Sequence, residues 1–408
     1  MAEPKIRFKQ VDGSSYPEWN DYAISDLFYK ITTKNQECTN KNVITNSAEF
    51  GLIPQRDFFD KDIAVEGKTE NYTIIQKGDF VYNPRKSSYA PMGPFNCYRL
   101  DEDGIVSPLY SCLRPKGILN SEYLLWYFQT DKWYGYVNDH GAQNGARHDR
   151  VGMTDKILMG IPVTAPCEEE QHKIIEFFST INEVITYSER EVANIEAQKK
   201  AVMKKIFSQE VRFKQSDGKD FPEWRDVRFG DVFTEIVRKT SDTETYPLYS
   251  LTIEDGVTAK TERYERSYLV KKVEDNYKIV PPNAFVYNPM NLRFGALAPS
   301  HEKKEVCVSQ YYNVFSLDDE TTLGFWESYL VSDTMLQYYF SIATGSLVEK
   351  LRVHYSSFVN IVKPIPCAEE QRLIAGFLYD FDEAIAAAKR ELELWRELKK
   401  GLLQQMFV

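Results

Sequence analysis

The chain contains one sequence pattern twice, about 200 residues apart, and this duplication limits what it can fold into. Arg7–Trp19 reads RFKQVDGSSYPEW, and Arg212–Trp224 reads RFKQSDGKDFPEW. The motifs FVYNP and PC-x-EEQ also occur once in each half, in the same order. Because this period is far longer than that of a solenoid repeat, the duplication predicts two tandem domains of one kind.

Each copy mixes strand and helix patterns. Residues 72–84 and 306–317 are rich in β-branched and aromatic side chains, interrupted by turn-forming residues, which predicts short strands. Residues 121–130 and 325–340 have a helical pattern. Strand-like runs close the copies at 156–163 and 358–366.

Both copies end in a long heptad pattern without proline, at residues 168–207 and 368–407. Apolar residues fill nearly all the a and d positions, which predicts a coiled coil. The predicted interface residues are Ile174, Phe178, Ile181, Ile185 and Ile195 in the first helix and Ile374, Leu378, Phe381, Ile385, Leu392 and Trp395 in the second. In the alternative, each helix lies on its own domain. The two helices have equal lengths and carry a lysine at the same seam position, which favours pairing of the helices with each other.

Two similar domains that each carry a similar helix pack most economically about a pseudo-two-fold axis, with the helices antiparallel. The predicted fold class is therefore α+β, with two tandem α/β domains joined by two long antiparallel coiled-coil helices. The first domain is predicted at residues 1–167 and its helix at 168–207. The second domain is predicted at residues 208–367 and its helix at 368–408.

Composition places the chain among ordinary globular proteins, with 43% hydrophobic and 27% charged residues. It has no apolar run long enough for a membrane span, no apolar segment at its N-terminus, and six cysteines without a CxxC pair. We therefore expect a cytoplasmic protein with no membrane partner. The net charge of −10 disfavours a generic nucleic-acid binder, but each helix span carries 8 acidic and 6 basic residues, so part of this charge lies on the helices.

Catalytic signatures are weak throughout. The GKT at Gly67–Thr69 lacks the first glycine of a P-loop, because Asp62 stands there. The two YNP motifs lack the second proline and the aromatic residue of the adenine methyltransferase loop, and no glycine-rich motif accompanies them. His140 and His148 have no metal-ligand spacing around them. We expect no catalytic residues, no metal site and no cofactor on this chain.

Polar side chains gather instead in two loops of each copy. Arg, Asn and Ser form hydrogen bonds with base edges, and Arg and Lys also neutralise phosphates. In the alternative, these loops are only solvated and bind no ligand. The polar residues stand at equivalent positions in both copies, which favours DNA contact. The candidate DNA-binding residues are Asn83, Arg85, Lys86, Ser87, Tyr89, Arg147, His148 and Arg150 in the first copy and Asn288, Asn291, Arg293, Lys350 and Arg352 in the second.

On these motifs the chain resembles the specificity (S) subunits of type I restriction–modification enzymes, the HsdS family. The YPEW and FPEW segments, the YNP motifs, the helix starts at Pro166–Gln171 and Pro366–Gln371, and the heptad helices carry the resemblance over essentially the whole chain. The resemblance implies two target recognition domains, each reading one half of a bipartite site in double-stranded DNA, with the helices setting the spacing.

The resemblance also implies partners in a bacterial or archaeal restriction system. Two methyltransferase (M) subunits would dock on the helices and perform the DNA modification, and restriction (R) subunits would join them. S-adenosylmethionine, ATP and Mg would be bound by those partners, and this subunit would be non-catalytic.

Two other classes of function remain as alternatives. An enzyme with its own recognition domains would need the cofactor and metal motifs that we do not find. A coiled-coil scaffold with duplicated domains and no DNA role would bind all duplexes equally. Salt-sensitive binding to one split sequence discriminates the scaffold from a DNA-reading protein.

Overall fold

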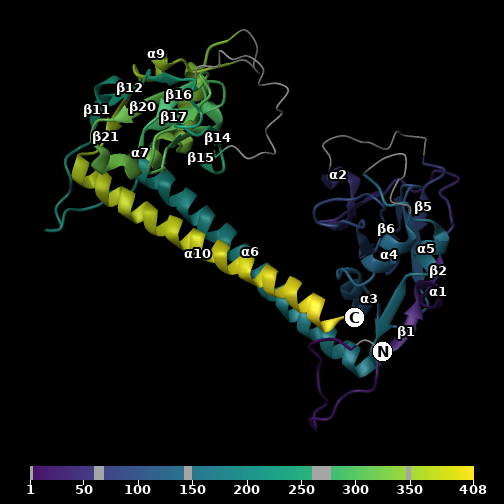
Figure 1. Ribbon diagram of the computed structural model, residues 1–408. Coiled ribbons are helices and arrows are strands. Elements are labelled where there is room, and N and C mark those ends of the chain that lie inside the picture. Colours follow the sequence, from purple (N-terminus) through teal and green to yellow (C-terminus); the bar gives the residue numbers. More distant parts are fainter. Residues whose placement is uncertain (1–2, 59–68, 142–148, 260–276, 346–350) are drawn as a thin grey trace. The chain divides into compact units, whose positions relative to one another are not determined.

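Each copy of the repeat folds as a mixed α/β unit in the computed structural model (Figure 1). The structure describes residues 3–58, 69–141, 149–259, 277–345 and 351–408. The first compact unit comprises residues 1–189 and 390–408, and the second comprises residues 190–389. Both unit boundaries therefore lie inside the long helices, whereas the sequence analysis placed them at the helix ends. Each unit holds one α/β domain and a segment of each helix.

The described strands of the first unit form two four-stranded sheets, of order β2-β9-β6-β7 and β4-β3-β8-β5, and a two-stranded ladder of β1 and β10. The strands are β1 (Asn20–Ala23), β2 (Phe28–Lys30), β3 (Val43–Ser47), β4 (Gly51–Pro54), β5 (Thr73–Ile75), β6 (Phe80–Tyr82), β7 (Phe95–Cys97), β8 (Gly104–Val106), β9 (Ser111–Pro115) and β10 (Pro162–Ala165). The short helices are α1 (Ile24–Leu27), α2 (Gln55–Phe58), α3 (Ser121–Phe128), α4 (Tyr134–His140) and α5 (Asp155–Met159). Only β3 and β8 pair in parallel among these described strands.

The second unit is built in the same way around the sheet β12-β20-β17-β18 and the ladder of β11 and β21. Its strands are β11 (Arg225–Arg228), β12 (Phe233–Glu235), β13 (Lys239–Thr240), β14 (Tyr249–Thr252), β15 (Gly256–Ala259), β16 (Tyr277–Val280), β17 (Phe285–Tyr287), β18 (Leu297–Pro299), β19 (Val306–Val308), β20 (Asn313–Leu317) and β21 (Val362–Ile365). Its helices are α7 (Leu323–Leu330), α8 (Asp333–Ile342) and α9 (Tyr355–Phe358), with 3-10 turns η1 (Phe229–Asp231), η3 (Leu292–Phe294) and η4 (Glu320–Thr322).

The FVY strands β6 and β17 occupy equivalent central places in the two units and are buried along their whole length. Aromatic rings fill the cores around them. Phe95 stacks on Phe128 with ring centroids 3.9 Å apart, and Phe285 stacks on Phe315 at 5.3 Å. Much of the high aromatic content is therefore used for core packing, and the loops that follow β6 and β17 are held on rigid frameworks.

The two long helices are α6 (Glu168–Phe207) and α10 (Ala368–Met406), close to the predicted bounds. In the first unit Phe178 contacts Phe407 and Arg396 pairs with Glu189. In the second unit Lys389 pairs with Glu196, and Lys199 pairs with Asp382. As residue numbers rise along α6 they fall along α10, so the helices run antiparallel. No helix among the described residues combines the length and the apolar character needed to cross a membrane.

The predicted seam residues lie on the covered side of these helices. Ile174, Phe178, Ile374 and Leu378 are at most 1% exposed. The remaining predicted seam residues are buried or half-buried: Ile181, Ile185, Ile195, Phe381, Ile385, Leu392 and Trp395. The heptad pattern therefore corresponds to the buried stripe of each helix.

Three shorter predicted elements differ from the structure. The helix predicted at 325–340 is divided into α7 and α8 at Val331 and Ser332. The strand predicted at 156–163 begins only at Pro162, because Thr154 caps the N-terminus of α5 by accepting a hydrogen bond from Ile157 N–H. The strand predicted at 358–366 likewise begins at Val362, after α9.

A buried glutamate fixes the start of each long helix. Glu170 is fully buried, and its carboxylate accepts hydrogen bonds from Arg7 Nε and Nη2, both at 2.9 Å, and from Trp19 Nε1 at 3.2 Å. In the second unit Glu370 accepts the same bonds from Arg212 and Trp224. These contacts explain three of the repeated motifs at once: the RFKQ arginine and the PEW tryptophan bind the PC-x-EEQ glutamate.

Candidate nucleic-acid interface

The first unit has a cleft of about 500 Å³ beside the loop that follows β6, here called the recognition cleft. Its walls are the end of β3 and residues 47–49, the loop 83–89, and residues around Ser107–Tyr110. Six of the predicted DNA-binding residues line it: Asn83, Arg85, Lys86, Ser87, Tyr89 and Arg150. The structure thus brings together two groups of residues that are about 60 positions apart in the sequence.

Backbone hydrogen bonds join these two groups. Lys86 N–H donates to Asp149 O at 2.9 Å, and Val151 N–H donates to Pro84 O at 2.8 Å. Arg85 and Arg150 are paired as an antiparallel bridge. The side chains that follow the YNP motif and those that precede α5 therefore share one edge, which is the arrangement that a base-reading surface requires.

The exposed side chains of the cleft remain accessible to a ligand. The Arg85 side chain is 70% exposed, and its Nε lies 3.8 Å from Asp149 Oδ2, so this ion pair is weak. Tyr89 is 72% exposed. Ser87 is exposed, and Lys86 and Arg150 are half-buried.

The asparagines of the two YNP motifs shape the loops. Asn83 is buried; its Nδ2 donates to Asn46 O, and its Oδ1 accepts from Arg85 N–H at 3.0 Å. Asn288 Oδ1 accepts from Met290 N–H at 3.0 Å. Each side chain thus accepts a hydrogen bond that closes the turn after its strand.

The second unit repeats this frame with different side chains. Val353 N–H donates to Pro289 O at 2.9 Å, as Val151 does to Pro84, and Arg352 is bridged to Thr344. Asn291 and Arg352 are exposed at this edge. Arg147, His148 and Lys350 lie outside the described residues.

Arg293 lies differently from the expected surface position. It is 6% exposed, and its guanidinium carbon is 4.7 Å from the ring centroid of Phe294 and 5.5 Å from that of Phe340. Phe340 belongs to α8, so no local sequence pattern predicts this stacking. In this conformation Arg293 shapes the loop and is not presented to a duplex.

Sequence reasoning missed several lining residues of the recognition cleft, among them Thr45, Asn46, Gln55 and Tyr72. Asn46 is buried in β3, where its Nδ2 donates to Val81 O at 2.8 Å and its Oδ1 accepts from Asn96. A buried asparagine in a short strand was the available signal, since such a residue needs partners from neighbouring segments.

Two buried cysteines lie in the core of the first unit, away from solvent. Burial raises the pKa of the Cys112 thiol to about 12 and that of Cys97 to about 11, so both remain protonated near neutral pH. Among the described residues, no group of three or more His, Cys, Asp or Glu side chains is arranged to hold a metal ion.

Comparison with known proteins supports the resemblance seen in the sequence. The specificity subunit of the type I restriction enzyme MjaVIII of Methanocaldococcus jannaschii is 27% identical over 213 residues. This chain is similar to that specificity subunit. The match covers 49% of this chain and 46% of the M. jannaschii protein, so it spans about half of that relative. No model of a known protein family matches the chain.

The fold is shared with a chain in a solved structure of the type I restriction–modification system. A chain from a study of complex assembly and conformational transition of the type I R-M system has a TM-score of 0.59 at 15% identity, covering 96% of this chain and 98% of that one. The HsdS subunit of Thermoanaerobacter tengcongensis and the S subunit of M. genitalium have TM-scores of 0.47 at 14% and 13% identity, with coverage of at least 98% of each chain. The predicted fold class is confirmed by the first of these.

Proposed function

We propose that this chain is the DNA sequence-specificity subunit of a type I restriction–modification complex, and that each unit reads one half of a bipartite site. The observation that carries this proposal is the duplicated frame. In both units the loop after the FVY strand is hydrogen-bonded to the segment before α5 or α9, and exposed polar side chains stand at that edge.

The side chains at these edges suit double-stranded DNA. Arginine forms paired hydrogen bonds with guanine, and serine and asparagine accept or donate at base edges. The recognition cleft offers two arginines, a lysine, a serine and an exposed tyrosine on one short stretch of surface. Because the second unit presents other side chains on an equivalent frame, the two half-sites differ in sequence.

The resemblance to type I specificity subunits supports the following partners. Two methyltransferase subunits dock on the helices, and restriction subunits join the complex. S-adenosylmethionine, ATP and Mg are bound by those partners, while this subunit positions the DNA and performs no chemistry, in the cytoplasm of a bacterium or archaeon. The long helices set the distance between the half-sites.

The test is a binding measurement on the complex of this chain with its methyltransferase subunits. Methylation mapping identifies a candidate split site, and titration of that duplex against scrambled duplexes at several salt concentrations measures specificity. We expect specific binding at least 10³-fold tighter than non-specific binding. Equal affinity for all duplexes contradicts the proposal and favours the scaffold alternative.

Truncation of Arg85 or Arg150 in the recognition cleft should relax the base specificity of the first half-site only. Arg85→Ala or Arg150→Ala is expected to lose about 1–3 kcal/mol of discrimination at a base of the first half-site, because each arginine then loses its paired hydrogen bonds. Methylation mapping should show the second half-site unchanged. The control is Lys77→Ala, which removes an exposed positive charge paired with Asp101 outside the cleft. Relaxation at both half-sites would contradict separate reading by the two units.

A further inference from the structure

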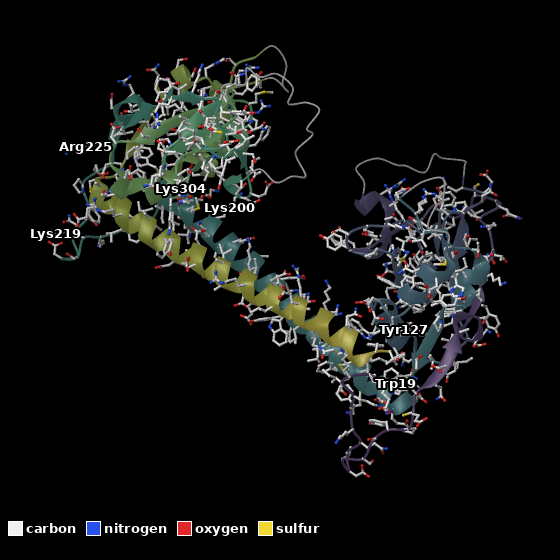
Figure 2. The ribbon with its side chains drawn as sticks, in the orientation of Figure 1. Trp19, Tyr127, Lys200, Lys219, Arg225 and Lys304 are labelled. Atoms are coloured by element: carbon white, nitrogen blue, oxygen red, sulfur yellow. The ribbon has the colours of Figure 1, made fainter. Side chains whose placement is uncertain are left out.

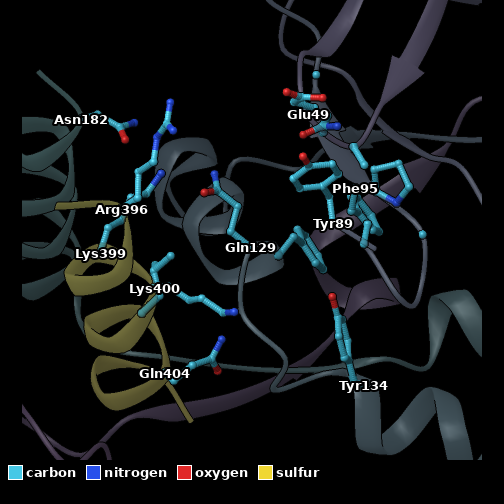
Figure 3. A pocket seen from close by; sticks show the side chains of 18 of the residues that line it. Glu49, Tyr89, Phe95, Gln129, Tyr134, Asn182, Arg396, Lys399, Lys400 and Gln404 are labelled. Atoms are coloured by element: carbon cyan, nitrogen blue, oxygen red, sulfur yellow. The ribbon is translucent and has the colours of Figure 1, made fainter. Parts of the chain in front are cut away.

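A second cleft in the first unit, of about 520 Å³, lies between the α/β domain and the two long helices; we call it the helix-side cleft. Figure 3 shows its helix wall, with Arg396, Lys399, Lys400 and Gln404 projecting from α10 and Asn182 from α6. The opposite wall carries Glu49, Tyr89, Gln129 and Tyr134. Three basic side chains thus line one cavity against a single lining carboxylate.

The equivalent lysines in the second unit are neutralised. Lys199 corresponds to Lys399 and pairs with Asp382. The counterpart of Asp382 in the first unit is Asn182, which carries no charge. Lys399 instead lies over the Trp126 ring, 4.9 Å from its centroid, and no carboxylate of the described residues pairs with it. The second unit therefore has an ion pair between Lys199 and Asp382. The equivalent positions of the first unit hold Lys399 and the uncharged Asn182.

The neighbouring lysine shows the same difference. Lys200 pairs with Asp333 at 3.4 Å in the second unit. Its counterpart Lys400 is exposed on the helix-side cleft and forms no ion pair with a described carboxylate. The corresponding pocket of the second unit, lined by Lys200 and Asp333, has only about 170 Å³. Lys199 and Lys200 thus pair with carboxylates in the second unit, although Lys204 also lines its pocket. Lys399 and Lys400 pair with no carboxylate among the described residues.

The difference is local to these two positions. Arg396 pairs with Glu189 at 2.7 Å, and the equivalent pair in the second unit, Lys389 with Glu196, has the same length. The helix pairing therefore keeps its other ion pairs in both units. The lack of an ion pair between Lys399 or Lys400 and a described carboxylate is therefore a feature of this cleft rather than of the helices in general.

The cleft also supplies neutral donors. Gln404 Oε1 accepts from Asp131 N–H at 3.4 Å, which leaves the Gln404 amide N–H groups to face the cavity. Gln129 and Asn182 line the same space. Burial lowers the pKa of Lys399, as expected for an ammonium that lacks a counter-charge. Cationic and amide donors around one cavity are the groups that bind a phosphate.

The helix-side cleft is continuous with the recognition cleft. Ala48, Glu49, Tyr89 and Pro94 line both cavities. The helix-side cleft therefore adjoins the surface proposed to bind the duplex. This continuity favours DNA over an acidic protein segment as the occupant.

We propose that the helix-side cleft of the first unit binds a backbone phosphate of the bound DNA through Lys399 and Lys400, and that the second unit lacks this contact. The inference rests on the proposed function. Phosphate contacts fix the position of a protein on the duplex without reading sequence, so the two half-sites would be held unequally. The first unit then contributes more salt-dependent affinity than the second.

The experiment uses the chain in complex with its methyltransferase subunits. Asn182→Asp gives Lys399 the partner that Lys199 already has, and Lys399→Gln removes the charge. Each variant should lower the slope of log K against log salt concentration by about one unit, with a several-fold weaker affinity that is equal for specific and scrambled duplexes. Lys199→Gln, the twin position in the second unit, is the matched control and should leave the slope unchanged.

The outcomes are distinguishable. An unchanged slope in Asn182→Asp and Lys399→Gln, with unfolding temperatures equal to the wild-type value, overturns the inference while wild-type specific binding upholds the proposed function. Loss of assembly on size exclusion at an unchanged slope also overturns it, because the cleft then binds an acidic partner surface. Failure of the wild-type complex to bind any split site overturns the proposed function and this inference together.

Discussion

Insertion of one heptad into each long helix is expected to abolish methylation of the wild-type site and create a site whose halves lie about three base pairs further apart. The insertions follow Glu189 in α6 and Lys389 in α10, with their a and d residues in phase. Seven helical residues add about 10.5 Å, and three base pairs add about the same length. The pairs Glu189–Arg396 and Glu196–Lys389 each lie within one unit and are kept.

The new site should be bound more weakly than the original one. Three base pairs rotate a duplex by about 100°, whereas a heptad rotates a helix end by only about 20°. Bending or twisting the DNA must compensate for this mismatch, at a cost on the order of 1–6 kcal/mol. Methylation mapping of cells that carry the variant measures both the new spacer and the extent of its modification.

Two controls separate spacing from damage to the helices. A heptad in α6 alone shifts the part of α6 beyond Glu189 against α10 and should abolish modification at all sites. A two-residue insertion in both helices rotates the apolar stripe by about 200°, away from the seam, and should also fail. Modification of the unchanged wild-type site by the double heptad variant would contradict a spacing role for the helices.

The sequence predicts the long helices and the duplication well because both rest on local or periodic signals. The heptads from Ile174 to Ile206 specify one buried stripe, and the absence of proline allows an uninterrupted helix. The short elements are less predictable. The start of α5 depends on the N-cap hydrogen bond of Thr154. The break between α7 and α8 contains neither proline nor glycine, so no helix-breaking residue in the sequence predicts it.

The candidate site is only partly predictable for a different reason. The residue types of the candidate site and their repeated positions are visible in the sequence, and they predict Arg85 and Arg150 as DNA-binding residues. The bridge that pairs them is a contact between distant segments, and local patterns carry no information on it. The stacking that buries Arg293 against Phe340 is non-local in the same way. The sequence shows an uncharged Asn182 at the position equivalent to Asp382. Which lysine of the opposite helix faces each residue depends on the register of the two helices, and this register is known only from the structure.

Replacement of either buried glutamate by alanine is expected to destabilise its own unit by about 3–5 kcal/mol, the typical effect of removing one partner of a buried ion pair. Glu170→Ala leaves the Arg7 guanidinium, whose side chain is 16% exposed, and the Trp19 N–H without their acceptor. In the wild-type protein, hydrogen bonding to Glu170 raises the pKa of Arg7. Arginine is not deprotonated in proteins even without such a partner, so the guanidinium stays charged in the variant and its burial without a counter-charge is unfavourable. Glu370→Ala has the same effect on Arg212 and Trp224.

Because each glutamate acts within one unit, the two losses should be separable. In Glu170→Ala, hydrogen exchange should accelerate in Arg7–Trp19 and in the first turns of α6, while the second unit keeps its protection. Glu370→Ala should show the reverse. The combined variant is expected to lose about 3–5 kcal/mol in each unit, the sum of two independent effects, so both units should show the accelerated exchange of the single variants. Glu169→Ala and Glu369→Ala remove exposed neighbours and serve as controls. Equal effects of Glu169→Ala and Glu170→Ala on urea unfolding would show that the buried pair does not hold the helix start.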